Sequence, residues 1–180
     1  MPNSVRAGSD VQQISLPRDA RAPERIGPAG LPVGTQIWTS DGILPVEYLS
    51  TGDRIVTRDG GYSRLTRLDT VATVVPMVRI VARALGPQRP DADLILQASQ
   101  AVLLRDKAAR DLTGRDRHVC TAGDLAEAGL ADGLGAFPVT LMVLHLRRQD
   151  VIYAAGLDVI CGIRGPSRRA SARQPAQNLR

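Results

Sequence analysis

Short runs of hydrophobic and polar positions alternate along the first third of the chain and are separated by turns that contain glycine. Residues 36–39 (QIWT) are followed by Ser40-Asp41-Gly42 and then by a second apolar run at residues 43–46. Asp-Gly between two β-forming runs favours a hairpin, because glycine tolerates the positive φ that a type I′ turn needs. The pattern recurs where residues 54–58 lead into residues 59–61 (DGG). The sequence therefore predicts two successive hairpins.

The remainder of the chain also favours strands. β-branched or alternating apolar runs predict further strands at residues 70–75, 77–82, 94–96, 101–104, 139–146 and 150–154. The last two runs are expected to pair with one another as a final hairpin. The best helical segment begins near Thr121 and ends by Leu130, with Gly129 as its stop signal. Many short strands and one short helix predict an all-β domain that depends on long-range pairings.

Length and charge indicate how the chain is divided. A chain of 180 residues, 43% of them hydrophobic, suits a single domain with a sizeable core. The net charge of +5 is uneven, because residues 164–180 contain five arginines and no acid, whereas residues 30–163 contain 14 basic and 15 acidic side chains. We expect a disordered leader at residues 1–29, the β domain at residues 30–163 and a disordered basic tail at residues 164–180.

The charge distribution also bears on partners and location. A near-neutral body argues against a basic nucleic-acid groove, and the tail lacks aromatic side chains that would stack on bases. The tail predicts weak, salt-sensitive contact with polyanions that is lost on truncation at Ile163. Apolar stretches such as residues 138–144 are too short to span a bilayer, and no apolar run precedes Asp10 as a secretory signal would require. The default expectation is a cytoplasmic protein, with signal-independent secretion left open.

The opening of the predicted β domain resembles a known family. Residues 34–37 (GTQI) lead through Asp41-Gly42 to residues 45–49 (PVEYL) and 52–57 (GDRIVT). This order resembles the first block of the stand-alone bacterial type of Hint (hedgehog/intein) domain. Segments within residues 84–104 and 151–157 resemble the second and closing blocks of the same family. The resemblance covers about residues 30–163 and implies a compact, horseshoe-like all-β fold with pseudo-two-fold topology.

The resemblance also implies a chemistry that can be examined position by position. In active members a Cys or Ser at the first residue of the domain attacks the preceding carbonyl, and a proton donor serves the leaving nitrogen. The nucleophile position, four residues before Gly34, is occupied by Gly30, and the first hydroxyl after it belongs to Thr35. The histidine positions of the second and closing blocks are occupied by Gln100 and Gln149. Because neither glycine nor glutamine supplies this chemistry, the resemblance predicts a degenerate domain without autocatalytic cleavage or splicing.

Three interpretations of the function remain open. The first is a non-catalytic Hint-like domain that serves as a binding or scaffold module for an unknown protein partner. The second is residual autoprocessing with a non-standard nucleophile, in which His145 replaces a lost histidine. The third is an unrelated all-β interaction domain whose tail contacts polyanions.

The cysteines and histidines offer other candidate sites. His118 and Cys120 stand two residues apart and would share one face of a strand, where the imidazole could activate the thiol. The simpler interpretation is a buried cysteine beside an exposed histidine. Together with His145 and Cys161 they offer two histidines and two cysteines, but their spacing matches no zinc finger. We therefore expect no metal, no other cofactor and no disulfide.

Trp38 is the only tryptophan in the chain and lies in the first predicted hairpin. We expect it to pack in or against the core, with an exposed interaction anchor as the alternative.

Overall fold

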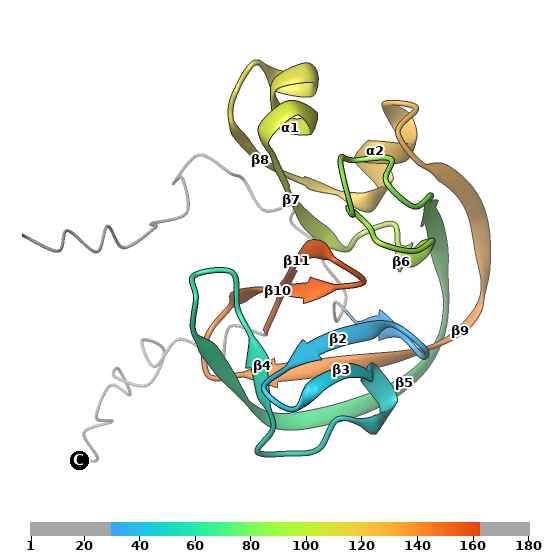
Figure 1. Ribbon diagram of the computed structural model, residues 1–180. Coiled ribbons are helices and arrows are strands. Elements are labelled where there is room, and N and C mark those ends of the chain that lie inside the picture. Colours follow the sequence, from blue (N-terminus) through green and yellow to red (C-terminus); the bar gives the residue numbers. More distant parts are fainter. Residues whose placement is uncertain (1–29, 163–180) are drawn as a thin grey trace, which may run out of the picture.

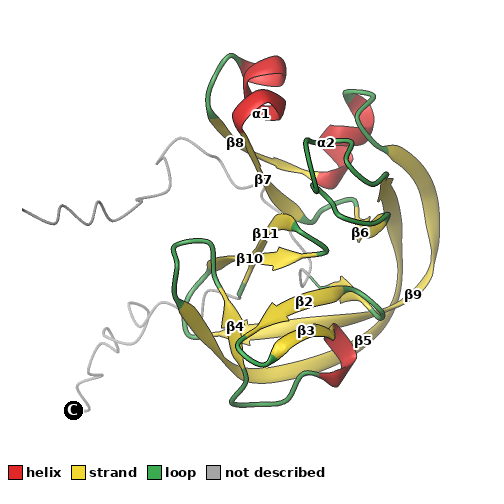
Figure 2. Ribbon diagram, in the orientation of Figure 1, coloured by secondary structure: helices red, strands yellow, loops and turns green. Residues whose placement is uncertain are grey.

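The computed structural model describes residues 30–162. The leader and basic tail expected at residues 1–29 and 164–180 lie outside the described residues, so their disorder and the polyanion contact of the tail stay predictions. Eleven strands dominate the described residues, and all of their pairings are antiparallel (Figure 2). The all-β class predicted from the sequence is confirmed.

The strands of the described residues are β1 (Leu31–Pro32), β2 (Gln36–Thr39), β3 (Gly42–Pro45), β4 (Arg54–Val56), β5 (Tyr62–Ile80), β6 (Leu94–Gln97), β7 (Ala101–Arg105), β8 (Arg117–Thr121), β9 (Asp132–Leu146), β10 (Asp150–Ala154) and β11 (Leu157–Cys161). The helices are α1 (Asp106–Thr113), α2 (Ala122–Glu127) and the short 3₁₀ helix η1 (Val46–Tyr48). None of the helices within residues 30–162 is long and apolar enough to cross a membrane.

The strands follow the order β1-β9-β5-β4-β2-β10-β11-β7-β8, with β3 added beside β2 and β6 beside β5. Figure 1 shows the long β5–β9 ribbon curving around one side of the molecule, while β2, β10 and β11 cross its middle. This arrangement gives the horseshoe-like shape that the resemblance implied. The core lies inside the curve and includes fully buried Leu31, Ile37, Ile55, Leu104 and Ile152.

Both predicted hairpins are present, but the turn of the first differs from the prediction. Thr39 pairs with Gly42, so Ser40 and Asp41 link the two strands. Of these residues only Gly42 has a positive φ, at 122°. A type I′ turn needs a positive φ at both linking residues, so that prediction is wrong. The Thr39 hydroxyl stabilises the turn instead, accepting from the Asp41 N–H (3.2 Å) and donating to the Gly42 carbonyl (2.8 Å).

The separate strands predicted at residues 70–75 and 77–82 are one strand, because β5 runs through Pro76. The Pro76 carbonyl accepts a hydrogen bond from the Ala98 N–H (2.8 Å). Within a strand the N and C=O of one residue point to the same side, so both polar positions of Pro76 face away from β9. The missing N–H therefore removes no bond from the β5–β9 ladder.

The final hairpin predicted between residues 139–146 and 150–154 is wrong. β9 pairs with β5 along most of its length and with β1 on its other side, whereas β10 pairs with β11. All five residues of β11 are buried, so this strand lacks the alternation by which the others were predicted.

The predicted helix starts where the sequence indicates. The Thr121 hydroxyl accepts from the Asp124 N–H (3.1 Å), and the Asp124 carboxylate accepts from the Thr121 N–H (2.7 Å). This reciprocal pair is a capping box and fixes the first turn of α2. The helix ends at Glu127, before the predicted limit at Leu130. The helix α1 is an addition to the single helix predicted from the sequence.

Candidate functional site

Gly30 stands immediately before β1 and is buried. The adjacent Leu31 pairs with Met142 of β9, which draws the start of the domain against that strand. A Cβ at Gly30 would lie 2.8 Å from the Leu141 Cβ and 3.2 Å from the Val143 Cγ2. Ordinary carbon contacts are about 3.5–4.0 Å. The expected nucleophile position therefore lacks both a side chain and the space for one.

Gln100 lies between β6 and β7 and is fully buried, with 0% of its surface exposed. Its Nε2 donates to the Ile160 carbonyl of β11 (2.8 Å) and to the Ala101 carbonyl (3.1 Å). Its backbone carbonyl accepts from the Ala122 N–H at the start of α2 (2.9 Å). The side-chain nitrogen thus joins β11 to the start of β7, and the backbone of the same residue adds α2, which is a structural task that needs no proton transfer.

Gln149 differs from the other two positions because it is exposed, in the turn between β9 and β10. The neighbouring Asp150 is buried, and its Oδ1 accepts from the Arg148 Nε (2.8 Å). Asp150 pairs with Cys161, near the end of the described chain.

Gly30 and Gln100 lie next to strands that are in contact with one another. Gly30 packs against β9, Gln100 bonds to β11, and β9 contacts β11, as β1 contacts β6. The nearby Thr35 hydroxyl is buried and donates to the Pro32 carbonyl (2.6 Å). Neither Gly30, Gln100 nor Gln149 supplies a thiol, an imidazole or a carboxylate. These positions therefore lack a group that could transfer a proton near neutral pH.

His145, proposed as a substitute histidine, belongs to an ion-pair cluster on the β5–β9 ribbon. Its Nε2 lies 2.8 Å from the Asp69 Oδ2 and 3.0 Å from the Arg67 Nη2, and Arg67 also donates to Asp69 (2.6 Å). Desolvation by burial raises the pKa of Asp69, but the hydrogen bonds from His145 and Arg67 outweigh it and lower the pKa below its ordinary value. Among the described residues, no hydroxyl or thiol is hydrogen-bonded to the His145 ring.

His118 and Cys120 share one face of β8, as predicted, opposite Leu104 and Val102 of β7. Cys161 lies on β11, which is separated from β8 by β7. Two strand spacings of about 4.8 Å exceed the reach of a disulfide, whose Cα atoms lie within about 7 Å. Within residues 30–162, no three His, Cys, Asp or Glu side chains gather as a set that could hold a metal ion.

The two cysteine thiols are expected to be unreactive in the folded protein. Burial raises the pKa of both thiols to about 12, and the charge of Asp124 adds to the effect at Cys120. At pH 8 we expect iodoacetamide to label both cysteines in denaturant and neither in the native chain, as measured by mass spectrometry. Since the unfolded thiols ionise near pH 9, their contribution to stability is complete below that pH and is lost as the pH rises from 9 towards 12. Native labelling of Cys120 at the rate of a free thiol would contradict this.

A third group of residues lies along β2, β10 and β11 and includes neighbouring side chains from the end of β7 and the loop after β4. The Trp38 ring of β2 stacks on Tyr153 of β10, with centroids 4.9 Å apart and planes inclined by 30°. Tyr153 pairs with Asp158 of β11, which bonds to Arg58 and Arg105. We call these five residues the aromatic–arginine row. Sequence reasoning missed the row because its members are spread from residue 38 to residue 158 and follow no motif; only Trp38 had been considered as an anchor.

Comparisons with known proteins agree with this fold. A family model described as the Hint domain matches residues 30–160. The solution structure of a bacterial intein-like domain from Clostridium thermocellum is 10% identical and covers 74% of this chain and 99% of its own, with a TM-score of 0.50. The crystal structure of the gp41-1 intein is 12% identical and covers 76% and 100% of the two chains, with a TM-score of 0.47. No curated protein matches the chain.

Proposed function

The chain belongs to the Hint domain family, and from that premise we propose that it is a non-catalytic member that serves as a binding or scaffold module. The family assignment removes the interpretation of an unrelated all-β domain. The chemical part of the proposal is that this chain does not cleave or splice the peptide bond before residue 30.

The observation that carries the proposal is the packing around Gly30. A nucleophile at the first position of the domain needs at least a Cβ, and a Cβ there would lie 2.8 Å from the Leu141 Cβ. Even the methyl group of alanine at residue 30 would therefore clash with the Leu141 side chain. Gln100 supports the same conclusion, because its amide is committed to the Ile160 and Ala101 carbonyls.

The competing proposal of residual autoprocessing has less support among the described residues. The His145 Nε2 lies within hydrogen-bond distance of Asp69 and Arg67, and no hydroxyl or thiol within residues 30–162 is hydrogen-bonded to its ring. The thiols of Cys120 and Cys161 are buried, and their raised pKa keeps them protonated at neutral pH.

The proposal is tested by the intact mass of the full-length chain carrying a short N-terminal extension. The purified protein is incubated for days at neutral pH, alone, with dithiothreitol and with hydroxylamine, because a thioester or ester is cleaved by such nucleophiles. We expect a single unchanged mass in all three samples. An active intein treated in parallel shows that the conditions support cleavage. A fragment ending at Ala29 would refute the proposal.

A further inference from the structure

The aromatic–arginine row forms one continuous strip across three strands of the sheet. β2, β10 and β11 are successive neighbours, and Trp38, Tyr153 and Asp158 occupy facing positions on them. Facing residues of paired strands point to the same side of a sheet. Arg105 extends from the end of β7, next to β11, and Arg58 from the loop between β4 and β5. Two stacked aromatic rings therefore border directly on a charged group.

The charges in the row do not balance. The Asp158 side chain is 2% exposed, and its Oδ2 accepts from Arg58 Nη1 at 2.8 Å and pairs with Arg105 Nε. The Arg58 and Arg105 side chains are 13% and 20% exposed, so they are partly withdrawn from water, and one carboxylate neutralises only one of the two charges. Arg117, which is exposed, lies opposite Arg105 on β8 and adds a further positive charge.

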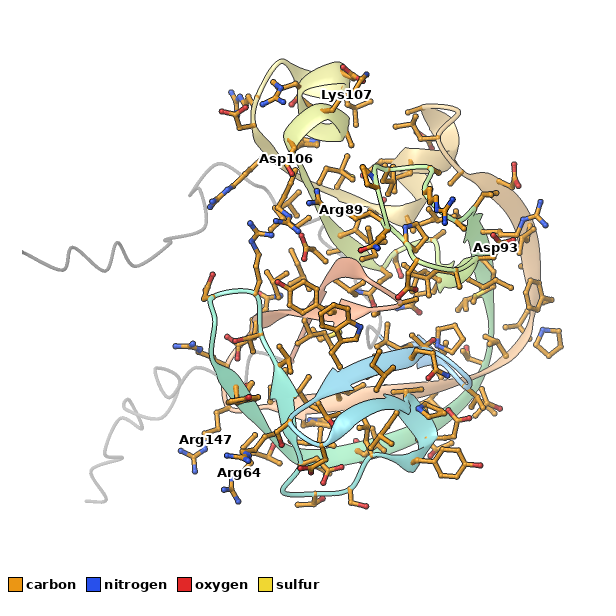
Figure 3. The ribbon with its side chains drawn as sticks, in the orientation of Figure 1. Arg64, Arg89, Asp93, Asp106, Lys107 and Arg147 are labelled. Atoms are coloured by element: carbon orange, nitrogen blue, oxygen red, sulfur yellow. The ribbon has the colours of Figure 1, made fainter. Side chains whose placement is uncertain are left out.

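A neighbouring ion pair does not remove this excess. Arg89 Nη1 lies 2.8 Å from Asp106 Oδ2 at the start of α1 (Figure 3), and although the Asp106 charge also acts on Arg105, this pair adds one charge of each sign. The row and its immediate neighbours thus retain a net positive charge in a half-buried setting, where attraction for an anion is stronger than in open water.

Apart from Arg105 Nε, which is ion-paired with Asp158 Oδ2, two buried polar atoms of the row have no hydrogen-bond partner among the described residues. They are the Trp38 Nε1, a donor, and the Asp158 Oδ1, an acceptor. Buried polar atoms are almost always hydrogen-bonded to protein or to ordered water, so both atoms can take a further partner. A complementary ligand offers an acceptor to Trp38, an N–H donor to Asp158 and a negative charge to the arginines.

An extended peptide with an acidic side chain offers all three groups, because its backbone carries both C=O and N–H. The residue types agree with this, since Trp, Tyr and Arg dominate the energetic centres of protein interfaces. A free oxyanion would satisfy the arginines but would leave the aromatic pair without a role. The chemistry therefore favours a peptide over a simple anion.

We propose that the aromatic–arginine row is the docking site for an acidic peptide segment of a partner protein. This inference rests on the proposed function as a binding module, and it assigns the surface and the chemical class of the partner.

The proposal is tested by selecting peptides from a random displayed library on the full-length chain. We expect the enriched peptides to carry Asp or Glu beside apolar residues.

R58Q and R105Q are expected to weaken the binding of these peptides about tenfold or more, because each removes a charged hydrogen-bond donor. W38F keeps an aromatic ring but removes the indole N–H, and is expected to weaken binding about threefold to tenfold while leaving the fold intact. The thermal midpoint of each variant identifies losses that are due to unfolding.

The matched control is R79Q, which removes the same charge from an exposed Arg79–Asp132 pair on the β5–β9 ribbon. We expect R79Q to change peptide binding less than twofold, because Arg79 is not part of the row and its exposed ion pair contributes little energy. Peptides without acids, equal losses in R79Q and R58Q, full displacement by millimolar inorganic phosphate, or no enrichment would each overturn the docking site. None of these results would affect the proposed lack of cleavage, which the intact mass decides separately.

Discussion

Asp158→Asn is expected to lower the free energy of unfolding by about 3 kcal/mol, because it leaves two guanidinium groups facing each other without their shared anion. Asp158 accepts from Arg58 (2.8 Å) and pairs with Arg105, and its side chain is almost completely withdrawn from solvent. The figure lies at the lower end of the range for broken buried pairs, since both arginines retain some contact with water. Urea-induced unfolding of the variant and the wild type measures the difference.

The control for this variant is Asp132→Asn. Asp132 bonds to Arg79 at 2.7 Å, but both side chains are about half exposed. An exposed pair of this kind contributes about 0–1 kcal/mol. The two variants remove the same charge, so the difference between them measures the combined effect of burial and of the second arginine at Asp158. Equal losses in D158N and D132N would show that the Asp158 cluster behaves as ordinary surface charge.

Gly30→Ala is expected to destabilise the domain by about 1–3 kcal/mol, the usual cost of forcing an extra carbon into a well-packed core. The added Cβ would lie 2.8 Å from the Leu141 Cβ and 3.3 Å from the Met142 carbonyl oxygen. Relief requires β1 to move away from β9, which would weaken the pairing of Leu31 with Met142. The free energy of unfolding in urea again measures the effect.

Gly133→Ala provides the matched comparison. A Cβ at Gly133 has nothing within 4 Å, and its φ lies outside the positive region. Alanine restricts the unfolded chain more than glycine does, so we expect an unchanged or slightly increased stability, by up to about 1 kcal/mol. If G30A were as stable as G133A, the space at the first position of the domain would be open after all. The principal support for a non-catalytic domain would then be lost.

Local chemistry allowed the hairpins and the helix start to be predicted, although not the turn type of the first hairpin. The hairpin of β2 and β3 has Gly42 at its positive φ, and α2 begins at Thr121 because Asp124 completes its capping box. These features depend on residues within four positions of one another, so the sequence contains the whole interaction. The partners of β9 and β10 depend instead on segments far apart in the chain, and hydrophobic alternation indicates that a strand exists without naming its neighbour.

The same division holds for the candidate sites. The sequence by itself determined which residue types stand at positions 30, 100 and 149, and a family pattern read along the chain predicts that these are the nucleophile position and the two histidine positions. Only the tertiary structure decided that Gly30 has no room for a side chain, since the obstructing Leu141 lies on β9. The tertiary structure alone also brings Arg58 next to Asp158, which is 100 residues away in the sequence. Side chains at such separations meet only after the backbone has folded, and no local pattern encodes the distance between them.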